Sequence, residues 1–345
     1  MPQRPRILLL IPHLGGGGAE KVISLLAHGL PPDKYEIHLG LVTQHDLDLA
    51  ELSPGVTAYR LGAHRVRYAA ARILKLIWRV RPAVVLSGIA HLNFLVLMLK
   101  PLLPRGTKLM IRQNSTASRS LAVDRLPVYT RFLYRSLYRH AHRIICPTNA
   151  MAEDLAAVAG IDEGLIAVAH NPLDRKNIEA ALSAQSRWNS PGPNLLAIGR
   201  LSREKGFDLL IEAMKSVSQK FPSARLVILG TGPEEATLKA RCSELDLDRF
   251  VTFAGYEKMP YSYYPGTTLF VLPSRHEGMP NALLEAFSAG LPLVATPASG
   301  GIVELLQDHP QSWIVPEISS AALSTTLVQA IRQLLPLCPE SGILR

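Results

Sequence analysis

The sequence has few cysteines and lacks a long uninterrupted apolar stretch. Its three cysteines, Cys146, Cys242 and Cys338, lie far apart and include no Cys-x-x-Cys pair, which argues against a zinc site and a disulfide framework. The most apolar region, residues 83–103, is broken by polar residues and a proline, whereas a membrane-spanning helix needs about 20 mostly apolar residues. The apolar run of residues 7–11 is too short for the core of a signal peptide. We therefore expect a cytoplasmic protein without a transmembrane helix.

Low-complexity segments are also missing, and charged residues make up only 19% of the chain against 48% hydrophobic residues. This composition is typical of a folded chain that buries real cores. Because 345 residues exceed the usual size of one core, two domains are expected. The formal net charge of +9 indicates an anionic partner, and the basic segments 60–81 and 112–143 predict that this partner meets the first half of the chain.

Short apolar runs recur along the chain, and most are followed by a turn and a helical pattern. This alternation predicts βαβ units on parallel sheets. A polar stretch near residues 173–193 separates two such series. We therefore predict two Rossmann-like, doubly wound α/β domains, residues 1–175 and 190–345, with ligands in an interdomain cleft outside the carboxyl ends of the strands. The runs interpreted as strands are RILLLI, YEIHLGLV, AVVLSG, KLMIRQ, RIICPT and LIAVAHNP, then LLAIGR, ARLVILG, RFVTFAG, TLFVLPS and PLVATP.

Four consecutive glycines, Gly15 to Gly18, follow the first predicted strand and precede an amphipathic helix expected from about Ala19. Glycines let the backbone approach a ligand closely, and a helix N-terminus offers N–H groups to an anion. The run matches neither G-x-G-x-x-G nor a P-loop. It predicts either a ligand-binding loop or a flexible turn without a chemical role.

Two cations stand in the loop that opens the second domain. Arg200 ends a predicted strand, and Lys205 precedes Gly206 and a helix expected from about Phe207. Both therefore lie at the carboxyl edge of the sheet, where they can neutralise a diphosphate, Arg200 through its planar fork and Lys205 as a compact charge. The alternative is a solvated loop with incidental charge.

The stretch SRHEGMPNALLEAFSAG, residues 274–290, holds two glutamates around a Gly-Met-Pro break. Pro280 suits the first turn of a helix, which leaves Glu277 in the preceding loop and Glu285 in the second turn. A carboxylate near phosphates needs another partner, and vicinal sugar hydroxyls donate two hydrogen bonds to one carboxylate. The alternative makes Glu277 a helix-flanking acid and Glu285 an exposed helix residue. The amides expected to face a phosphate belong to Gly278, Met279, Asn281 and Ala282.

The motifs follow one another in the order found in a known family. They are GGGGAE, CPTNAMAEDL, VAHNPLD, GRLSREKGFDLLIEA, LVILGTGPEEATL, VTFAGY, LFVLPSRHEGMPNALLEAFSAGLPLVAT and GGIVELL. Over about residues 7–335 the chain thus resembles the family 4 glycosyltransferases of the GT-B fold, which are retaining enzymes that use nucleotide sugars. The segment from Glu277 to Glu285 is the most specific part of this resemblance.

The resemblance implies a role for each matching position. Arg200 and Lys205 correspond to the cations on the donor diphosphate, Glu285 to the glutamate on the nucleotide ribose, and Glu277 to the glutamate near the transferred sugar. In this family cations and amides stabilise the leaving phosphate, so neither a metal nor another cofactor is expected. Catalysis is thus assigned to Glu277, Arg200 and Lys205, and donor binding to Gly16, Gly17, Arg200, Lys205, Gly278, Met279, Pro280, Asn281, Ala282 and Glu285.

Two features test this interpretation. Metal-dependent transferases hold a divalent ion with a D-x-D motif, which occurs here at residues 46–48 and 246–248. The first follows a peripheral strand, and the second is interpreted as a helix end. Neither is therefore expected to bind a metal ion. Many relatives carry a histidine after the fourth or fifth strand, where this chain has Arg112 and Asn114. His13 and His91 are predicted to follow other strands and to be structural or peripheral.

Two basic helices are predicted in the first domain. One carries Arg72, Lys75 and Arg79 opposite an apolar face, and the other carries a basic stripe with interleaved aromatic residues. Such helices suit an anionic membrane interface, or they are ordinary surface helices. Relatives that extend polyprenyl-diphosphate glycans use first-domain surfaces of this kind. The second stripe comprises Arg131, Arg135 and Arg139, with Tyr129, Phe132, Tyr134 and Tyr138.

The expected reaction is transfer of an N-acetylhexosamine from a uridine-diphosphate sugar to a lipid-linked or envelope glycan, such as a lipopolysaccharide precursor. The acceptor is expected to be a glycan or a polyprenyl-diphosphate-linked glycan, and the enzyme to sit peripherally on the inner face of the cell membrane. A GDP-mannose-dependent mannosyltransferase and a nucleotide-sugar epimerase or hydrolase remain alternatives. Binding to nucleic acid is not expected, because the sequence carries no RNA- or DNA-binding motif.

Overall fold

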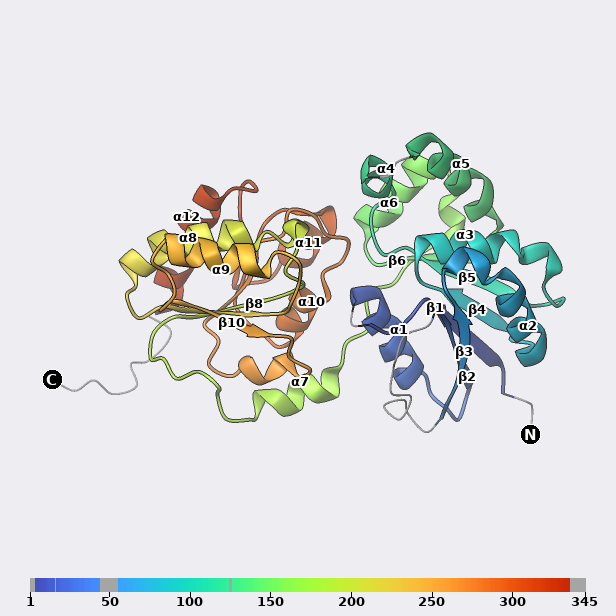
Figure 1. The fold of residues 1–345 in the computed structure, drawn as a ribbon, viewed down its shortest axis with the longest axis horizontal. Coiled ribbons are helices and arrows are strands. Elements are labelled where there is room, and N and C mark those ends of the chain that lie inside the picture. The colour runs from blue at the N-terminus through green and yellow to red at the C-terminus, as the bar shows by residue number, and fades with distance from the viewer. Residues whose placement is uncertain (1–3, 16, 44–54, 124–125, 336–345) are drawn as a thin grey trace. The chain divides into compact units, whose positions relative to one another are not determined.

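The computed structural model describes residues 4–15, 17–43, 55–123 and 126–335. The chain divides between Pro172 and Leu173 into two compact units, residues 1–172 and 173–345, each built around its own sheet (Figure 1). Among the described residues, no helix is long and apolar enough to span a bilayer.

The sheet of the first unit has seven parallel strands in the order β3-β2-β1-β4-β5-β6-β7. The interior strand β1 is apolar after Arg6, because helices cover both faces of a parallel sheet. The strands are β1 (Arg6–Ile11), β2 (Glu36–Thr43), β3 (Val56–Ala63), β4 (Val84–Ser87), β5 (Lys108–Arg112), β6 (Arg143–Cys146) and β7 (Ile166–Val168); the helices are α1 (Gly18–Gly29), α2 (Ala70–Val80), α3 (Ala90–Met98), α4 (Ala117–Val123), α5 (Pro127–Leu137) and α6 (Asn149–Ala159).

The second unit repeats this architecture with six parallel strands in the order β10-β9-β8-β11-β12-β13. Its strands are β8 (Asn194–Ile198), β9 (Arg225–Leu229), β10 (Val251–Gly255), β11 (Leu269–Leu272), β12 (Leu293–Ala295) and β13 (Ser312–Ile314). Its helices are α7 (Arg175–Leu182), α8 (Phe207–Lys220), α9 (Glu235–Glu244), α10 (Asn281–Ser288), α11 (Gly300–Leu306) and α12 (Ser320–Leu334).

Sequence analysis missed one strand in each sheet. β3, with the sequence VTAYRLGA, is an edge strand in which most residues are only partly buried, so it shows no continuous apolar run. β13, with the sequence SWI, is a three-residue edge strand, too short for a periodic signal. All eleven predicted runs do form strands, and the prediction of two doubly wound parallel-sheet domains is confirmed.

Both sheets reverse their strand order at one point, and the carboxyl ends of the strands on either side leave room for a ligand there. In the first unit this point lies between β1 and β4, and in the second between β8 and β11. The loop after β8 and the loop after β11, residues 199–206 and 273–280, therefore flank the switch point of the second sheet. These two loops contain Arg200, Lys205 and Glu277, and Glu285 follows on α10.

Candidate active site

Gly206 brings the loop after β8 against the end of β11. It adopts φ +65°, which favours glycine, and a Cβ built there would lie 2.1 Å from the carbonyl oxygen of Pro273. The backbone turns directly from a short 3-10 segment, Arg203–Lys205, into α8, which begins at Phe207 as predicted. Lys205 is thereby held beside the loop that carries Glu277.

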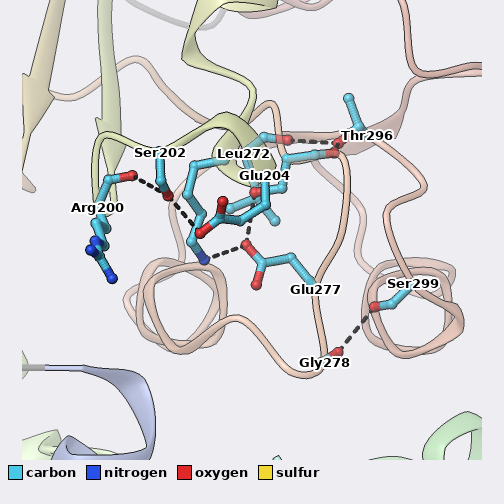
Figure 2. A network of polar contacts seen from close by, with 10 residues as sticks. Arg200, Ser202, Glu204, Leu272, Glu277, Gly278, Thr296 and Ser299 are labelled. Atoms are coloured by element: carbon cyan, nitrogen blue, oxygen red, sulfur yellow. Dashed lines mark hydrogen bonds and ion pairs between the residues drawn. The ribbon is translucent and has the colours of Figure 1, made fainter. Parts of the chain in front are cut away.

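Lys205 and Glu277 form an ion pair, with the Nζ and Oε1 atoms 2.7 Å apart (Figure 2). The hydroxyl of Ser274 donates a second hydrogen bond to the same oxygen, also at 2.7 Å. The Glu277 side chain is only 8% exposed, against 26% for Lys205. Since this carboxylate is nearly buried, its two hydrogen bonds fix its direction. The structure thus brings together two residues that lie 72 positions apart in the chain.

Arg200 does not join this pair. Its side chain is exposed and makes no hydrogen bond or ion pair with any described residue, while its carbonyl oxygen accepts from the amide of Ser202 at 2.9 Å. Figure 2 shows its guanidinium turned away from the pair formed by Lys205 and Glu277. The charge of Arg200 is therefore available to a ligand at the same edge of the sheet.

The segment after β12 supports the loop that carries Glu277. The Thr296 hydroxyl donates to the carbonyl oxygen of Ser274, the Glu277 amide donates to Ala298 at 3.4 Å, and the Ser299 hydroxyl donates to Gly278 at 3.0 Å. Figure 2 shows this support on the side of the loop away from Arg200. The loop is therefore anchored at several successive residues before α10 begins.

Helix α10 starts at Asn281, with Pro280 at the N-cap, one position earlier than the first turn in which the sequence analysis placed it. The amide of Leu284 is the first to bond within the helix, to Pro280 at 3.1 Å. Gly278, Met279, Asn281 and Ala282 lie around this N-terminus, where the positive end of the helix dipole favours an anion.

Glu285 is buried on α10, with 3% of its surface exposed. The alternative that it is an exposed helix residue is therefore wrong. Its charge acts on Tyr264: the burial of Tyr264 and, secondly, the charge of Glu285 raise the pKa of Tyr264 well above its ordinary value. Burial of a carboxylate costs free energy that packing alone does not offset.

Sequence analysis missed Arg275 and Asp208. Both terminal nitrogens of Arg275 donate to the two carboxylate oxygens of Asp208 at 2.6 Å, and Nη1 also donates to the carbonyl oxygen of Arg203 at 3.0 Å. The Arg275 amide donates to Glu204 at 2.8 Å. These contacts join the loop after β11 to the loop and helix after β8. The available signal was an arginine beside Glu277 and an acid in the first turn of α8.

In the first unit the glycine loop precedes α1, which begins at Gly18, and Gly17 is its N-cap. The ring of His13 accepts a hydrogen bond from the Gly15 amide at 3.0 Å and lies 3.9 Å from Glu20. His13 thus contacts the loop itself, and its role as a structural or peripheral residue stays a prediction. Gly16 lies outside the described residues.

Arg112 is buried at the end of β5, with 4% of its surface exposed. Its guanidinium donates to the side-chain oxygens of Asn114 and Asn171, and it makes no ion pair with any described residue. Burial lowers the pKa of Arg112 to about 10. Arg112 and Asn114 therefore form one network that joins the loops after β5 and β7.

His91 follows a different strand from the one expected. Because β3 precedes it, β4 is the fourth strand of the first unit, and His91, exposed in the first turn of α3, follows this strand. The prediction that His91 follows a strand other than the fourth or fifth was therefore wrong. It arose because the missed strand β3 shifted the count by one.

The second D-x-D segment closes a helix, as predicted. Asp246 follows α9 with φ +55°, Leu247 is buried, and Asp248 accepts a hydrogen bond from Ser243 at 2.8 Å. In the part of the chain that the structure describes, no three His, Cys, Asp or Glu side chains cluster in a way that could hold a metal ion. Asp46 and Asp48 lie outside the described residues.

The two basic helices differ from each other. On α2, Arg72, Lys75 and Arg79 are exposed opposite buried apolar residues, as predicted. On and just after α5, Arg131, Arg135 and Arg139 are exposed too, but Tyr134 and Tyr138 are core residues with 1% and 0% exposure. Two of the four aromatic residues predicted to interleave with this stripe are therefore not available to a membrane interface, because their rings pack edge-on within the core. Four large apolar side chains remain exposed there: Leu126, Val128, Tyr129 and Phe132.

Comparison with family models covers nearly the whole chain. Residues 16–177 match the model described as Glycosyltransferase Family 4, and residues 179–335 match the model described as Glycosyl transferases group 1. The two matches meet within a few residues of the boundary between the structural units.

Relatives of known sequence match over different lengths. An uncharacterized glycosyltransferase of Haemophilus influenzae is 35% identical over 120 residues, 35% of this chain and 34% of that protein, so the chain spans about a third of its length. The N-acetylgalactosamine-N,N'-diacetylbacillosaminyl-diphospho-undecaprenol 4-alpha-N-acetylgalactosaminyltransferase of Campylobacter jejuni is 27% identical over 310 residues, 87% of this chain and 83% of that protein.

Solved structures share the fold at low sequence identity. Sucrose-phosphate synthase from Thermosynechococcus elongatus superimposes with a TM-score of 0.77 at 16% identity, over 96% of this chain and 91% of that chain. Anabaena HepE in complex with UDP superimposes with a TM-score of 0.75 at 17% identity, over 96% of this chain and 90% of that chain.

Proposed function

Because this chain belongs to the family 4 glycosyltransferases of the GT-B fold, we propose that it moves a sugar from a nucleotide sugar to a glycan acceptor, with retention and without a metal ion. The observation that carries this proposal is the convergence of Lys205, Glu277 and the N-terminus of α10 at the carboxyl edge of the second sheet. Cation, carboxylate and helix terminus are the groups that a diphosphate and its attached sugar require.

Each group has a definite task in this proposal. Lys205 has three N–H donors and uses one for Glu277, so it can also donate to a phosphate. The exposed guanidinium of Arg200 and the amides near the N-terminus of α10 bind the same diphosphate. As the bond to the sugar breaks, negative charge grows on the leaving phosphate, and these fixed groups stabilise it.

The two glutamates bind hydroxyls rather than exchange protons. Oε1 of Glu277 accepts from Lys205 and Ser274, and no described residue bonds to Oε2, so this oxygen is left for the transferred sugar. Glu285, in the second turn of α10, is assigned to the ribose of the nucleotide.

The donor is proposed to be a UDP-linked N-acetylhexosamine and the acceptor a lipid-linked or envelope glycan. In support, the Campylobacter jejuni relative is named for N-acetylgalactosaminyl transfer to a diphospho-undecaprenol acceptor, and the structural neighbour HepE was solved with UDP. GDP-mannose is the alternative donor, and sugar epimerisation or hydrolysis is the alternative chemistry on the same fold.

The first unit is proposed to bring the protein to the inner face of the cell membrane through α5. Val128 is 83% exposed and Phe132 63%, and both stand among the exposed arginines Arg131 and Arg135. Apolar side chains inside a basic rim suit the interface of a membrane with anionic lipids. A lipid-linked acceptor would be reached at this surface.

Transfer from UDP-N-acetylhexosamine to a lipid-linked acceptor tests the proposal. We expect full activity in EDTA and a loss of about 100-fold or more in kcat for Lys205→Met and Glu277→Gln. Lys239→Met serves as the control, since Lys239 pairs with Glu235 on the surface of α9. Unchanged activity in both site variants would contradict the site assignment, and donor consumption without acceptor would favour an epimerase or hydrolase.

A further inference from the structure

A basic cavity lies at the amino-terminal edge of the first sheet, opposite the carboxyl ends of its strands. β1, β4 and β5 are neighbours, so the segments that precede them meet at the amino-terminal edge. They border a shallow cavity of about 540 Å³. The amide of Ala83 donates to Arg6 and that of Lys108 donates to Ala83, both at 2.9 Å, which holds the segments together. The lining residues are Arg4, Pro5, Arg6, Trp78, Arg81, Pro82, Ala83, Pro104, Arg105, Gly106 and Thr107.

Two of the four arginines in this cavity are used by the fold. Arg6 pairs with Glu36 at 3.1 Å and donates to the carbonyl oxygen of Val80 at 3.0 Å, while Arg4 donates to Pro32. Arg6 thus already serves the C-terminus of α2, which is the usual structural task of a cation there. No acidic residue lines the cavity among the described residues.

The other two arginines, Arg81 and Arg105, make no hydrogen bond or ion pair through their side chains with described residues. Both are exposed, and Arg81 places its guanidinium 5.9 Å from the centre of the Trp78 ring. That ring is itself 48% exposed and fixed by a hydrogen bond from its nitrogen to Leu102 at 3.0 Å. Two available cations thus line the same cavity as one anchored aromatic ring.

Arg81 occupies a position that favours glycine. It caps α2 with φ +49° and ψ +58°, one of two non-glycine residues with positive φ in the described chain, and its amide donates to Ile77 at 2.7 Å. A left-handed conformation costs a non-glycine residue roughly 1–2 kcal/mol. Glycine would cap the helix without this cost, so the arginine side chain must contribute something other than helix capping.

We propose that this cavity binds a phosphate-bearing ligand, with Arg81 and Arg105 on the phosphate and the Trp78 face against the adjoining ring or chain. Guanidinium groups bind phosphate oxygens in pairs, and an aromatic face next to them takes up a sugar ring or an apolar segment. The site lies at the amino-terminal edge of the first sheet, whereas the proposed donor site belongs to the second unit, so it does not depend on the proposed function.

Binding of inorganic pyrophosphate, measured by calorimetry in a Lys205→Met background, tests the proposal. We expect Arg81→Gly with Arg105→Ala to raise the dissociation constant at least tenfold. Arg81→Gly alone should keep or raise the melting temperature, which separates lost binding from lost folding. Asp246→Gly, at the other positive-φ position, is the matched control and should leave binding unchanged.

Flotation with phosphatidylglycerol vesicles distinguishes a lipid headgroup from a soluble phosphate ester. Reduced pyrophosphate binding in the double variant supports the site with a soluble ligand, and reduced flotation supports it with a lipid headgroup. If the double variant changes neither pyrophosphate binding nor flotation, the proposal is wrong.

Discussion

Glu277 receives its orientation from residues that lie far from it in sequence. Lys205 and Ser274 both donate to Oε1 of Glu277. These two hydrogen bonds fix the orientation of the carboxylate and therefore the direction of its other oxygen, Oε2. Arg275, two residues earlier, is bonded to Asp208 and to the backbone of Arg203. From these contacts we predict that Arg275 and Asp208 position the loops of the proposed donor site.

Replacement of Asp208 by asparagine tests this role. Because Asp208 is about half exposed, the pair contributes less than about 1 kcal/mol to the free energy of unfolding, so stability should change little. The donor KM should rise several-fold, because the two loops lose their cross-link. A double-mutant cycle with Arg275→Met measures the coupling, and Arg241→Met is the control on the surface. Additive effects on KM would contradict the role.

The same pair has a pH signature. Burial alone would raise the pKa of Asp208, but the hydrogen bonds and charge of Arg275 hold this pKa below its ordinary value of 3.8. A depressed carboxyl pKa contributes stability above the unfolded pKa, and this contribution is lost as pH falls through the folded pKa. The small deficit of Asp208→Asn should therefore vanish in acid.

At the scale of elements, the site depends on how closely the turn into α8 approaches the end of β11. Gly206 permits this approach, through both its positive φ and its lack of a Cβ. The loop after β11 is in turn held by the segment after β12. The loops after β8, β11 and β12, which are neighbours in the sheet, thus form one connected edge.

Gly206→Ala should lower the free energy of unfolding by about 2–4 kcal/mol, since it adds a clash with Pro273 to the cost of positive φ. Gly290→Ala is the matched control in the same unit, with φ +72° and no atom within 4 Å of the added Cβ, and should cost only about 1–2 kcal/mol. Urea denaturation measures both values. Equal losses would show that the contact with Pro273 does not matter.

The whole molecule combines a basic, partly apolar surface on the first unit with the candidate donor site on the second. The net charge of +9 alone indicated an anionic partner, and the structure places exposed apolar side chains next to the arginines of α5. In the proposed membrane contact, charge attracts the protein to an anionic bilayer, and the apolar side chains enter the interface and retain it there.

Vesicle flotation checks this surface. Val128→Ser with Phe132→Ser should reduce binding to vesicles about tenfold or more at any ionic strength. Arg131→Gln with Arg135→Gln should reduce it by a similar factor only at low salt, because each arginine contributes about 1 kcal/mol near an anionic surface. Met259→Ser, exposed on the second unit, is the control. Equal flotation of all variants would contradict the proposal.

Much of the architecture follows from the sequence because local patterns carry it. Eleven apolar runs predicted eleven strands, and the start of α8 at Phe207 was predicted from its turn. The family was recognised from ordered motifs, and the family models confirm it. By contrast, β3 was missed because an edge strand need not be apolar on both faces, and β13 because it has only three residues.

The sequence by itself determined the composition of the candidate site: two cations and one glutamate in the loops after two strands, and a second glutamate on the helix that follows Pro280. Only the tertiary structure decided that Lys205, rather than Arg200, pairs with Glu277. It also decided that Glu285 is buried and that Arg275 binds Asp208. It also decided that Tyr134 and Tyr138 belong to the core. The physical reason is that periodicity specifies which face of an element is apolar, whereas a contact between two side chains depends on how separate elements pack together.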